Sequence, residues 1–213
     1  MSLLYDLPPR LAALLFRGVI AKGPPGAVYL TFDDGPDPSQ TPHFLQILRA
    51  MNCPATFFLT GSNVIDFPVV ALQIAHANQG IGSHGFSHLS LLSASRVSAR
   101  KEIAASVKAI EQATGVQPKL FRPPYGRIGP GVNAAAAELG MMTVLWSLSG
   151  ADWKEKNSAA LTARIVNRAR DGDVILLHDA GKCAPVTLAA LPDIINGIRA
   201  KGLQIAPLPV AKE

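Results

Sequence analysis

Short runs of β-branched and apolar residues alternate with longer segments of helical period along most of the chain, and this alternation limits the fold more than any other feature. A repeated strand and helix order is typical of a parallel sheet with helices packed outside it. The sequence therefore predicts an α/β fold, a distorted parallel (β/α)7-type barrel, with an open doubly wound sheet as the alternative. The expected strands are Val28 to Phe32, Ala55 to Leu59, Ile81 to Ser83, Lys119 to Phe121, Met142 to Trp146, Val174 to Leu177 and Gln204 to Ala206. The expected helices are Pro42 to Met51, Val69 to Gln79, Ser93 to Thr114, Gly131 to Leu139, Ala159 to Arg170 and Thr187 to Ala200.

Length and composition favour one domain. The chain has 213 residues, of which 48% are hydrophobic and 16% charged, enough for one substantial core. We expect a single domain over residues 1–213, with residues 1–26 as an N-terminal lead-in. No stretch approaches the roughly 18 uninterrupted apolar residues of a membrane span, so no transmembrane segment is expected. The stretch Leu11 to Ile20 is interrupted by Arg17 and lacks a small-residue cleavage pattern, so no signal peptide is expected, and the compartment stays open with the cytoplasm as the default.

The basic residues and the cysteines point to no special partner. The formal net charge is +5 and the sequence pI is about 9.4, but the lysines and arginines are scattered rather than gathered into a stripe. Nucleic-acid binding is therefore not expected. Cys53 and Cys183 lie far apart and match no zinc or redox spacing, so we interpret them as buried thiols.

Polar residues that are costly to bury follow five of the expected strands. In parallel barrels the C-terminal ends of the strands form the face on which catalytic groups collect. We therefore expect these residues to lie at one rim of the barrel. They are Asp33 and Asp34, His84 and His88, Arg122 to Tyr125, Asp152 and Trp153, and His178 and Asp179.

His84 and His88 are four residues apart, so both imidazoles can point the same way from one helical turn and bind a divalent ion. A carboxylate from Asp33 or Asp34 would complete the ligand set and leave positions open for water and substrate. From the spacing alone, a pair of surface or core histidines is an equal alternative. The adjacent aspartates repel unless a cation or an arginine compensates them, although a solvated turn would also account for their sequence.

Five motifs in order resemble the polysaccharide deacetylase family, that is, carbohydrate esterase family four with its NodB-homology domain. They cover the chain from Thr31 to His178 and read Thr-Phe-Asp-Asp-Gly-Pro at 31–36, Ser-His-Gly-Phe-Ser-His at 83–88, Arg-Pro-Pro-Tyr-Gly at 122–126, Asp-Trp at 152–153 and Leu-Leu-His at 176–178. The resemblance implies a barrel of parallel strands.

The resemblance also implies a role for each motif residue. Asp33 is then the general base, with Arg122 pairing with it and tuning it, and His178 is the general acid, oriented by Asp152. The metal ligands are Asp34, His84 and His88. The backbone N–H of Tyr125 binds the oxyanion, and Trp153 and Leu176 line the acetate methyl pocket. The fourth motif departs from the family pattern because Ser149 replaces its first aspartate, so substrate contacts there are expected to differ.

The implied function is metal-dependent removal of N-linked acetyl groups from N-acetylated amino sugars in a chitin-like or peptidoglycan-like glycan. Zn²⁺ is the favoured ion, with Co²⁺ or another divalent ion as alternatives. Other reactions for the same site are O-acetyl xylan ester hydrolysis and amino-sugar deformylation. A non-catalytic carbohydrate-binding barrel would show erosion of the site residues, and a metal-free amidohydrolase would lack the paired histidines. The expected partner is the glycan, the oligomeric state stays open, and members of the family are often secreted or associated with the cell envelope.

Overall fold

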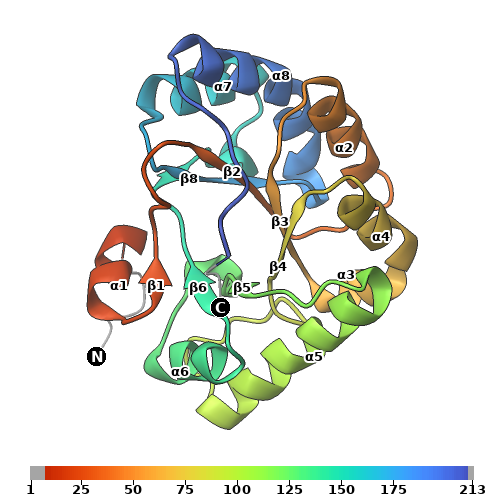
Figure 1. The fold of residues 1–213 in the computed structure, drawn as a ribbon, viewed down its shortest axis with the longest axis vertical. Coiled ribbons are helices and arrows are strands. Elements are labelled where there is room, and N and C mark those ends of the chain that lie inside the picture. Colours follow the sequence, from red (N-terminus) through yellow and green to blue (C-terminus); the bar gives the residue numbers. More distant parts are fainter. Residues whose placement is uncertain (1–7, 211–213) are drawn as a thin grey trace.

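The strands form one curled parallel sheet, shown in Figure 1. The computed structural model describes residues 8–210, and within them the strand order is β1-β6-β5-β4-β3-β2-β8-β7. Residues 145–147 connect β6 to β7 and contact strands near both ends of this order: the Leu145 N–H donates to the Ile20 oxygen of β1 at 2.7 Å, and the Ser147 N–H donates to the Val174 oxygen of β8 at 3.0 Å. The strands are β1 Val19–Ile20, β2 Tyr29–Asp33, β3 Thr56–Leu59, β4 Gly80–Ser83, β5 Leu120–Phe121, β6 Met142–Val144, β7 Leu148–Ser149 and β8 Val174–His178.

Helices surround the outside of the sheet, and several begin and end where the sequence supplies a cap. The Ser95 Oγ accepts the Ser98 N–H at 3.2 Å at the start of α5, and Gly115 ends that helix with a left-handed conformation. The α-helices are α1 Pro9–Leu15, α2 Thr41–Ala50, α3 Gly61–Asp66, α4 Pro68–His76, α5 Arg96–Thr114, α6 Pro130–Glu138, α7 Ser158–Arg168 and α8 Ala184–Ala200. The short 3-10 helices are η1 Pro124–Gly126, η2 Asp152–Lys154 and η3 Gly181–Cys183.

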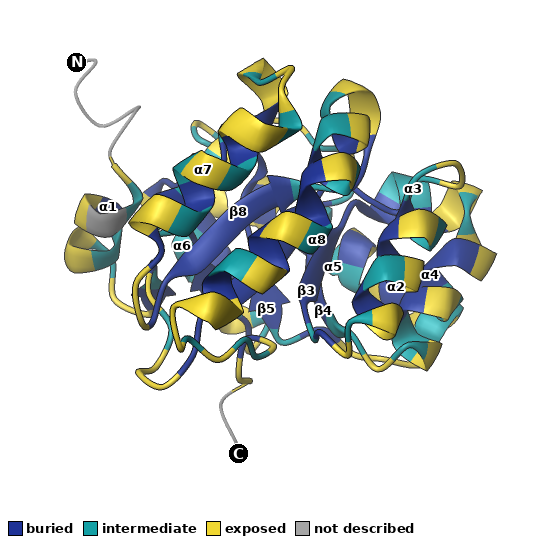
Figure 2. Ribbon diagram, turned by 90° about the horizontal axis from the view of Figure 1, so that it is seen from above, coloured by how far each residue is buried: buried dark blue, intermediate teal, exposed yellow. Residues whose placement is uncertain are grey.

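The two faces of the sheet pack against different partners because successive side chains of a strand point to opposite faces. Leu30, Phe32 and Phe57 face outward into a large core shared with the helices. Tyr29, Phe58 and the remaining inward-facing residues fill the barrel interior. Figure 2 shows the buried strands at the centre and helices that expose only their outer faces. The fold is thus a distorted (β/α)7-type barrel, as the strand and helix alternation predicts.

Several predicted boundaries need correction. Residues 204–206 form no strand, because only one isolated bridge joins Val28 and Ile205. Helix α3 and strands β1 and β7 are absent from the prediction. Residues 1–7 of the expected lead-in lie outside the described residues, whereas the rest of it contributes α1 and the edge strand β1, which pairs with β6.

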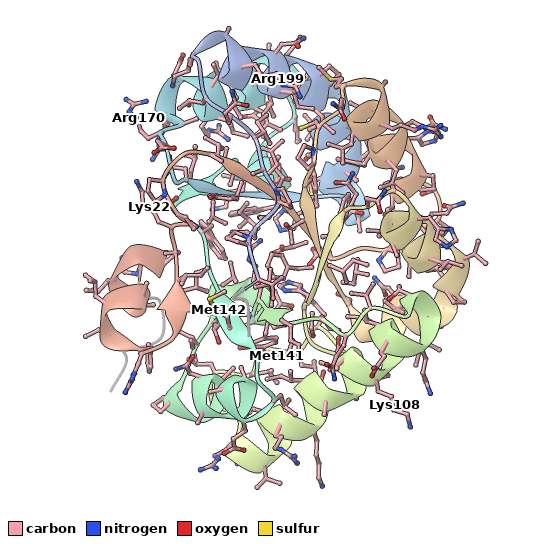
Figure 3. All side chains as sticks on the ribbon, in the orientation of Figure 1. Lys22, Lys108, Met141, Met142, Arg170 and Arg199 are labelled. Carbon is pink, nitrogen blue, oxygen red and sulfur yellow. The ribbon has the colours of Figure 1, made fainter. Side chains whose placement is uncertain are left out.

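The charged residues agree with the expectation of a scattered distribution. Figure 3 places Lys22, Lys108, Arg170 and Arg199 at separate points on the periphery. Among the described helices, none is both long and apolar enough to cross a membrane.

Candidate active site

The strand register brings the residues of the first and fifth motifs side by side at the C-terminal rim of the barrel. Asp33, the last residue of β2, pairs in register with His178, the last residue of β8, and with Phe58 of β3 on its other side. Asp33 lies on the same face of its strand as Tyr29, so its side chain is directed toward the barrel interior. His84 and Arg122 follow directly after β4 and β5 and reach the same rim.

Asp34, His84 and His88 form a compact set of three donor groups. A ligand atom of each lies within 4.8 Å of the others. The Asp34 Oδ1 lies 3.4 Å from the Nε2 of His84 and 3.0 Å from the Nε2 of His88. The Nδ1 of His84 donates to the backbone oxygen of Arg122 at 2.8 Å, which leaves Nε2 of His84 as the nitrogen directed at Asp34.

These three residues fit a divalent metal ion. The Asp34 Oδ1 is buried, yet it accepts no hydrogen bond. Burial by itself would raise the pKa of Asp34, but the imidazoles of His84 and His88 outweigh burial and lower that pKa below its ordinary value. Two imidazoles and one carboxylate are a ligand set of catalytic zinc sites, in which further positions stay open for water or substrate. The Asp34 Oδ1, which is buried without a hydrogen bond and faces two ring nitrogens, is therefore suited to bind such an ion.

The two histidines do not lie on a helical turn, so the predicted local geometry is wrong. Residues 84–88 form a loop in which Gly85 and His88 have positive φ angles of 80° and 55°. Glu102 of α5 holds this loop, since its Oε1 accepts hydrogen bonds from the backbone N–H and the Oγ of Ser87. The loop path, not a 3.6-residue period, directs both imidazoles at Asp34.

Asp33 is paired with a completely buried arginine. The Nη1 of Arg122 donates to Asp33 Oδ1 at 2.6 Å and to Thr31 Oγ1 at 2.8 Å. Burial lowers the pKa of Arg122 while Asp33 raises it, and a guanidinium keeps its proton in either case. The remaining guanidinium nitrogens donate to the backbone oxygens of Val144 and Leu145, at 3.3 and 3.1 Å. Arg122 thus fixes the position of the Asp33 carboxylate and places a positive charge next to it.

His178 is held by Asp152 of η2. The Nδ1 of His178 donates to Asp152 Oδ1 at 2.9 Å, while Asp152 Oδ2 accepts from the His178 backbone N–H and from Thr187 Oγ1, both at 2.8 Å. Burial would lower the pKa of His178, but the hydrogen bond and charge of Asp152, with smaller contributions from Asp33 and Asp34, raise it to about 9. The imidazole therefore carries two protons at neutral pH. Sequence reasoning missed Thr187, which lies within α8 and has no motif around it.

Tyr125, Trp153 and Leu176 lie around this rim at different depths. The Tyr125 ring is edge-on to His88 at 4.8 Å between centroids, and the Trp153 ring is edge-on to His178 at 5.6 Å. Both aromatic side chains are largely exposed, whereas Leu176 is buried and pairs in register with Thr31. Tyr125 has a positive φ of 60°, which sets the direction of its backbone N–H.

Asp179 and Ser149 complete the surroundings of the site. Asp179 is fully buried, accepts a hydrogen bond from Thr41 Oγ1 at 2.5 Å, and burial raises its pKa to about 7. Its carboxylate packs against Gly35, where any Cβ would approach it to 2.6 Å. The Ser149 Oγ accepts the backbone N–H of Ala151 at 3.0 Å, so the serine stabilises the turn that leads to Asp152.

Comparisons with known proteins agree with this arrangement. Residues 21–144 match the model of the family described as polysaccharide deacetylase. A peptidoglycan-N-acetylglucosamine deacetylase of Bacillus cereus is 36% identical over 85% of this chain and 66% of the relative, so the chain spans slightly less than two thirds of that protein.

Two solved structures are also similar. The Bc1960 peptidoglycan N-acetylglucosamine deacetylase is 33% identical, with a TM-score of 0.90 over 96% of each chain. BA3943 from Bacillus anthracis, described as a carbohydrate esterase family four pseudoenzyme, is 27% identical, with a TM-score of 0.84 over 95% of this chain and 69% of the other. The fold alone therefore does not establish catalysis, but the matched family model and the relatives show that this chain belongs to the polysaccharide deacetylase family.

Proposed function

We propose that this protein hydrolyses the acetamido group of N-acetylated amino sugars in a glycan and releases acetate. The observation that carries the proposal is the meeting of three arrangements at one rim. These are the donor set Asp34, His84 and His88, the carboxylate of Asp33 paired with Arg122, and the protonated imidazole of His178. Amide hydrolysis needs a nucleophilic water, a place for the oxyanion and a proton for the amine, and these residues match those needs.

Asp33 is the proposed general base. The guanidinium of Arg122 holds the Asp33 carboxylate in place and offsets its repulsion from Asp34. Asp33 can then accept a proton from an attacking water as the new C–O bond forms. Asp34, His84 and His88 would hold a divalent ion, which we propose to be zinc, and that ion would supply Lewis acidity for the water and the acetamide carbonyl.

His178 is the proposed general acid. An amine leaves poorly unless it is protonated, so the acid must carry a proton when the C–N bond breaks. Asp152 meets this need because it fixes the orientation of the imidazole and raises its pKa to about 9. We propose that the Tyr125 backbone N–H binds the oxyanion, and that Trp153 and Leu176 contact the acetyl methyl group.

The retained residues favour catalysis over a binding function alone. A non-catalytic member of the family can keep the barrel and lose the chemistry, as the similarity to a pseudoenzyme illustrates. In this chain the proposed base, acid and ligands are all present, and each has the partner that its role requires. Several relatives are named for peptidoglycan or chitooligosaccharide deacetylation, which supports a polymeric N-acetylated glycan as the substrate.

Acetate release provides the direct test. The protein, loaded with one equivalent of zinc, is incubated with chitooligosaccharides, peptidoglycan and acetyl-xylan, and acetate is quantified. We expect release from at least one N-acetylated glycan, loss of release after chelation, and recovery when zinc is added back. Release from acetyl-xylan alone would replace the proposal with an esterase, and no release from any of the three would refute catalysis on these glycans.

A further inference from the structure

A second group of side chains that could hold a metal ion includes the proposed acid, His178. Asp152, His178 and Cys183 each offer a ligand atom within 4.8 Å of the others. Carboxylate, imidazole and thiolate are all zinc ligands, and a thiolate favours soft ions in particular. No motif contains Cys183, and the proposed deacetylation does not use it.

The local backbone brings Cys183 to this place. Cys183 ends η3 directly before α8, and its Sγ contacts the Ala180 oxygen at 3.6 Å. Thr187, one turn into α8, donates to Asp152 Oδ2 at 2.8 Å, and its Oγ1 also lies 3.2 Å from the Cys183 oxygen. One hydroxyl therefore connects the two elements that carry Cys183 and Asp152. His178 and Cys183 are only partly buried, so an ion from solvent has a route to them.

The charges around Cys183 favour a cation and disfavour a free thiolate. Burial and the carboxylates of Asp152, Asp34 and Asp179 raise the pKa of Cys183 to about 12, so the thiol stays protonated and is a poor nucleophile. The same negative surroundings attract a divalent ion, which neutralises the thiolate as it coordinates. Cys183 is therefore better suited to bind a metal ion than to react with an oxidant.

We propose that Asp152, His178 and Cys183 form a second, inhibitory site for zinc or another soft divalent ion. The ion replaces the proton that Nδ1 of His178 donates to Asp152, and it also displaces the thiol proton of Cys183, so two protons are released to solvent for each ion bound. His178 then keeps only its Nε2 proton, and Asp152 no longer supports an imidazolium. The inhibitory consequence rests on the proposed role of His178 as the acid, whereas binding of the ion does not.

The second site should be the weaker one. Binding there must displace a hydrogen bond and two protons, including one from a thiol with a raised pKa. The set Asp34, His84 and His88 has a buried carboxylate oxygen that is already without a hydrogen bond. We therefore expect activity with the first equivalent of metal and inhibition as further metal binds.

Metal titration of matched cysteine variants tests the proposal. Protein holding one equivalent of zinc is titrated with zinc, with acetate release and bound zinc both measured. A parallel titration with Co²⁺ follows the thiolate-to-cobalt charge-transfer absorption. For Cys183→Ser, we expect loss of that absorption and an increase of about 10- to 100-fold in the zinc concentration that halves activity. Cys53→Ser alters the other, buried thiol, which lies just before the N-terminal end of β3 and thus at the opposite end of the strands from the site, and should behave as the unaltered protein does.

The outcomes separate this inference from the proposed function. If no glycan is deacetylated, the charge-transfer absorption and the second equivalent still report whether Cys183 binds metal. Inhibition of equal strength in Cys183→Ser would overturn the proposal, as would a cobalt complex without thiolate absorption. Cys183→Ala repeats the test with no hydroxyl to act as a substitute ligand.

Discussion

Two regions of the site use the same residue types, aspartate and histidine, in opposite ways. In the first, Asp34 Oδ1 faces the ring nitrogens of His84 and His88 and accepts no hydrogen bond. In the second, both carboxylate oxygens of Asp152 accept hydrogen bonds, from His178 and from Thr187. The first region therefore fits an added cation, whereas the second is complete without one, which agrees with the proposed role of His178 as a proton donor.

The difference shows that hydrogen-bond satisfaction, rather than residue identity, separates a metal site from an acid pair. A buried acceptor without a donor costs free energy unless a cation occupies its lone pairs. Asp152 avoids this cost because His178 and Thr187 supply donors. Because the Asp152 carboxylate already has these donors, we expect an ion to bind to Asp152, His178 and Cys183 only at higher concentration.

The largest expected effect is for His84→Ala. This change removes one imidazole from the set with Asp34 and His88, so metal and acetate release should be lost together. Metal content is measured by elemental analysis of protein dialysed against trace zinc, and activity is measured on the same samples. His76→Ala, at the end of α4 and outside the site, is the control and should keep both. Retention of one full equivalent of zinc by His84→Ala would contradict the assignment.

His178→Ala should lower turnover by about 10² to 10⁴ while the metal content stays at one equivalent, because this side chain is the proposed proton donor and is not one of the proposed ligands of the first site. The measurement is the turnover number together with zinc analysis. Zinc loss as large as that in His84→Ala would show that the two regions are not functionally distinct.

Asp152→Asn should change the pH dependence of turnover. The pKa of His178 is raised to about 9, above its ordinary value of 6.5, so its acid form is present below that pH and turnover should fall as pH rises through about 9. Removing the Asp152 charge should move this alkaline limb to lower pH by about 1 to 3 pH units. The stability contributed by the pair is likewise complete below pH 6.5 and is lost as pH rises through about 9. A pH profile of turnover that is identical in the variant would exclude Asp152 as the source of the raised pKa.

The smallest expected effect is for Ser149→Ala. This change removes the acceptor for the Ala151 N–H, at a residue with a positive φ of 50° directly before Asp152. The free energy of unfolding should fall by about 0.5 to 1.5 kcal/mol, with zinc content unchanged. Chemical denaturation measures the loss, and Ser158→Ala, at the partly exposed first residue of α7, serves as a control with the same change of side chain. A change in zinc content would show that the two regions are more tightly coupled than their separate hydrogen bonds suggest.

Much of the barrel follows from residues close together in the sequence. The strands β2, β3, β4, β5, β6 and β8 all coincide with predicted apolar runs, and each predicted helix overlaps an observed one. The two-residue strands β1 and β7 are too short to show a period, so they were missed. Residues 204–206 have the composition of a strand, but only one bridge holds them, since strand pairing depends on the partner as well as on local preference. The spacing of the histidines predicts a helical turn at 84–88, but that spacing does not report the positive φ of Gly85 and His88.

The sequence by itself determined which chemical groups stand at the ends of the strands, because the apolar runs and the motifs that follow them are both local. Only the tertiary structure decided which of these groups meet. Arg122 reaches Asp33 across 89 positions, Thr41 reaches Asp179 across 138, and Thr187 reaches Asp152 across 35. Such contacts depend on strand register, on how the sheet curls and on loop paths, none of which is encoded in a short stretch. For the same reason, the fold brings Cys183, which belongs to no motif, next to Asp152 and His178.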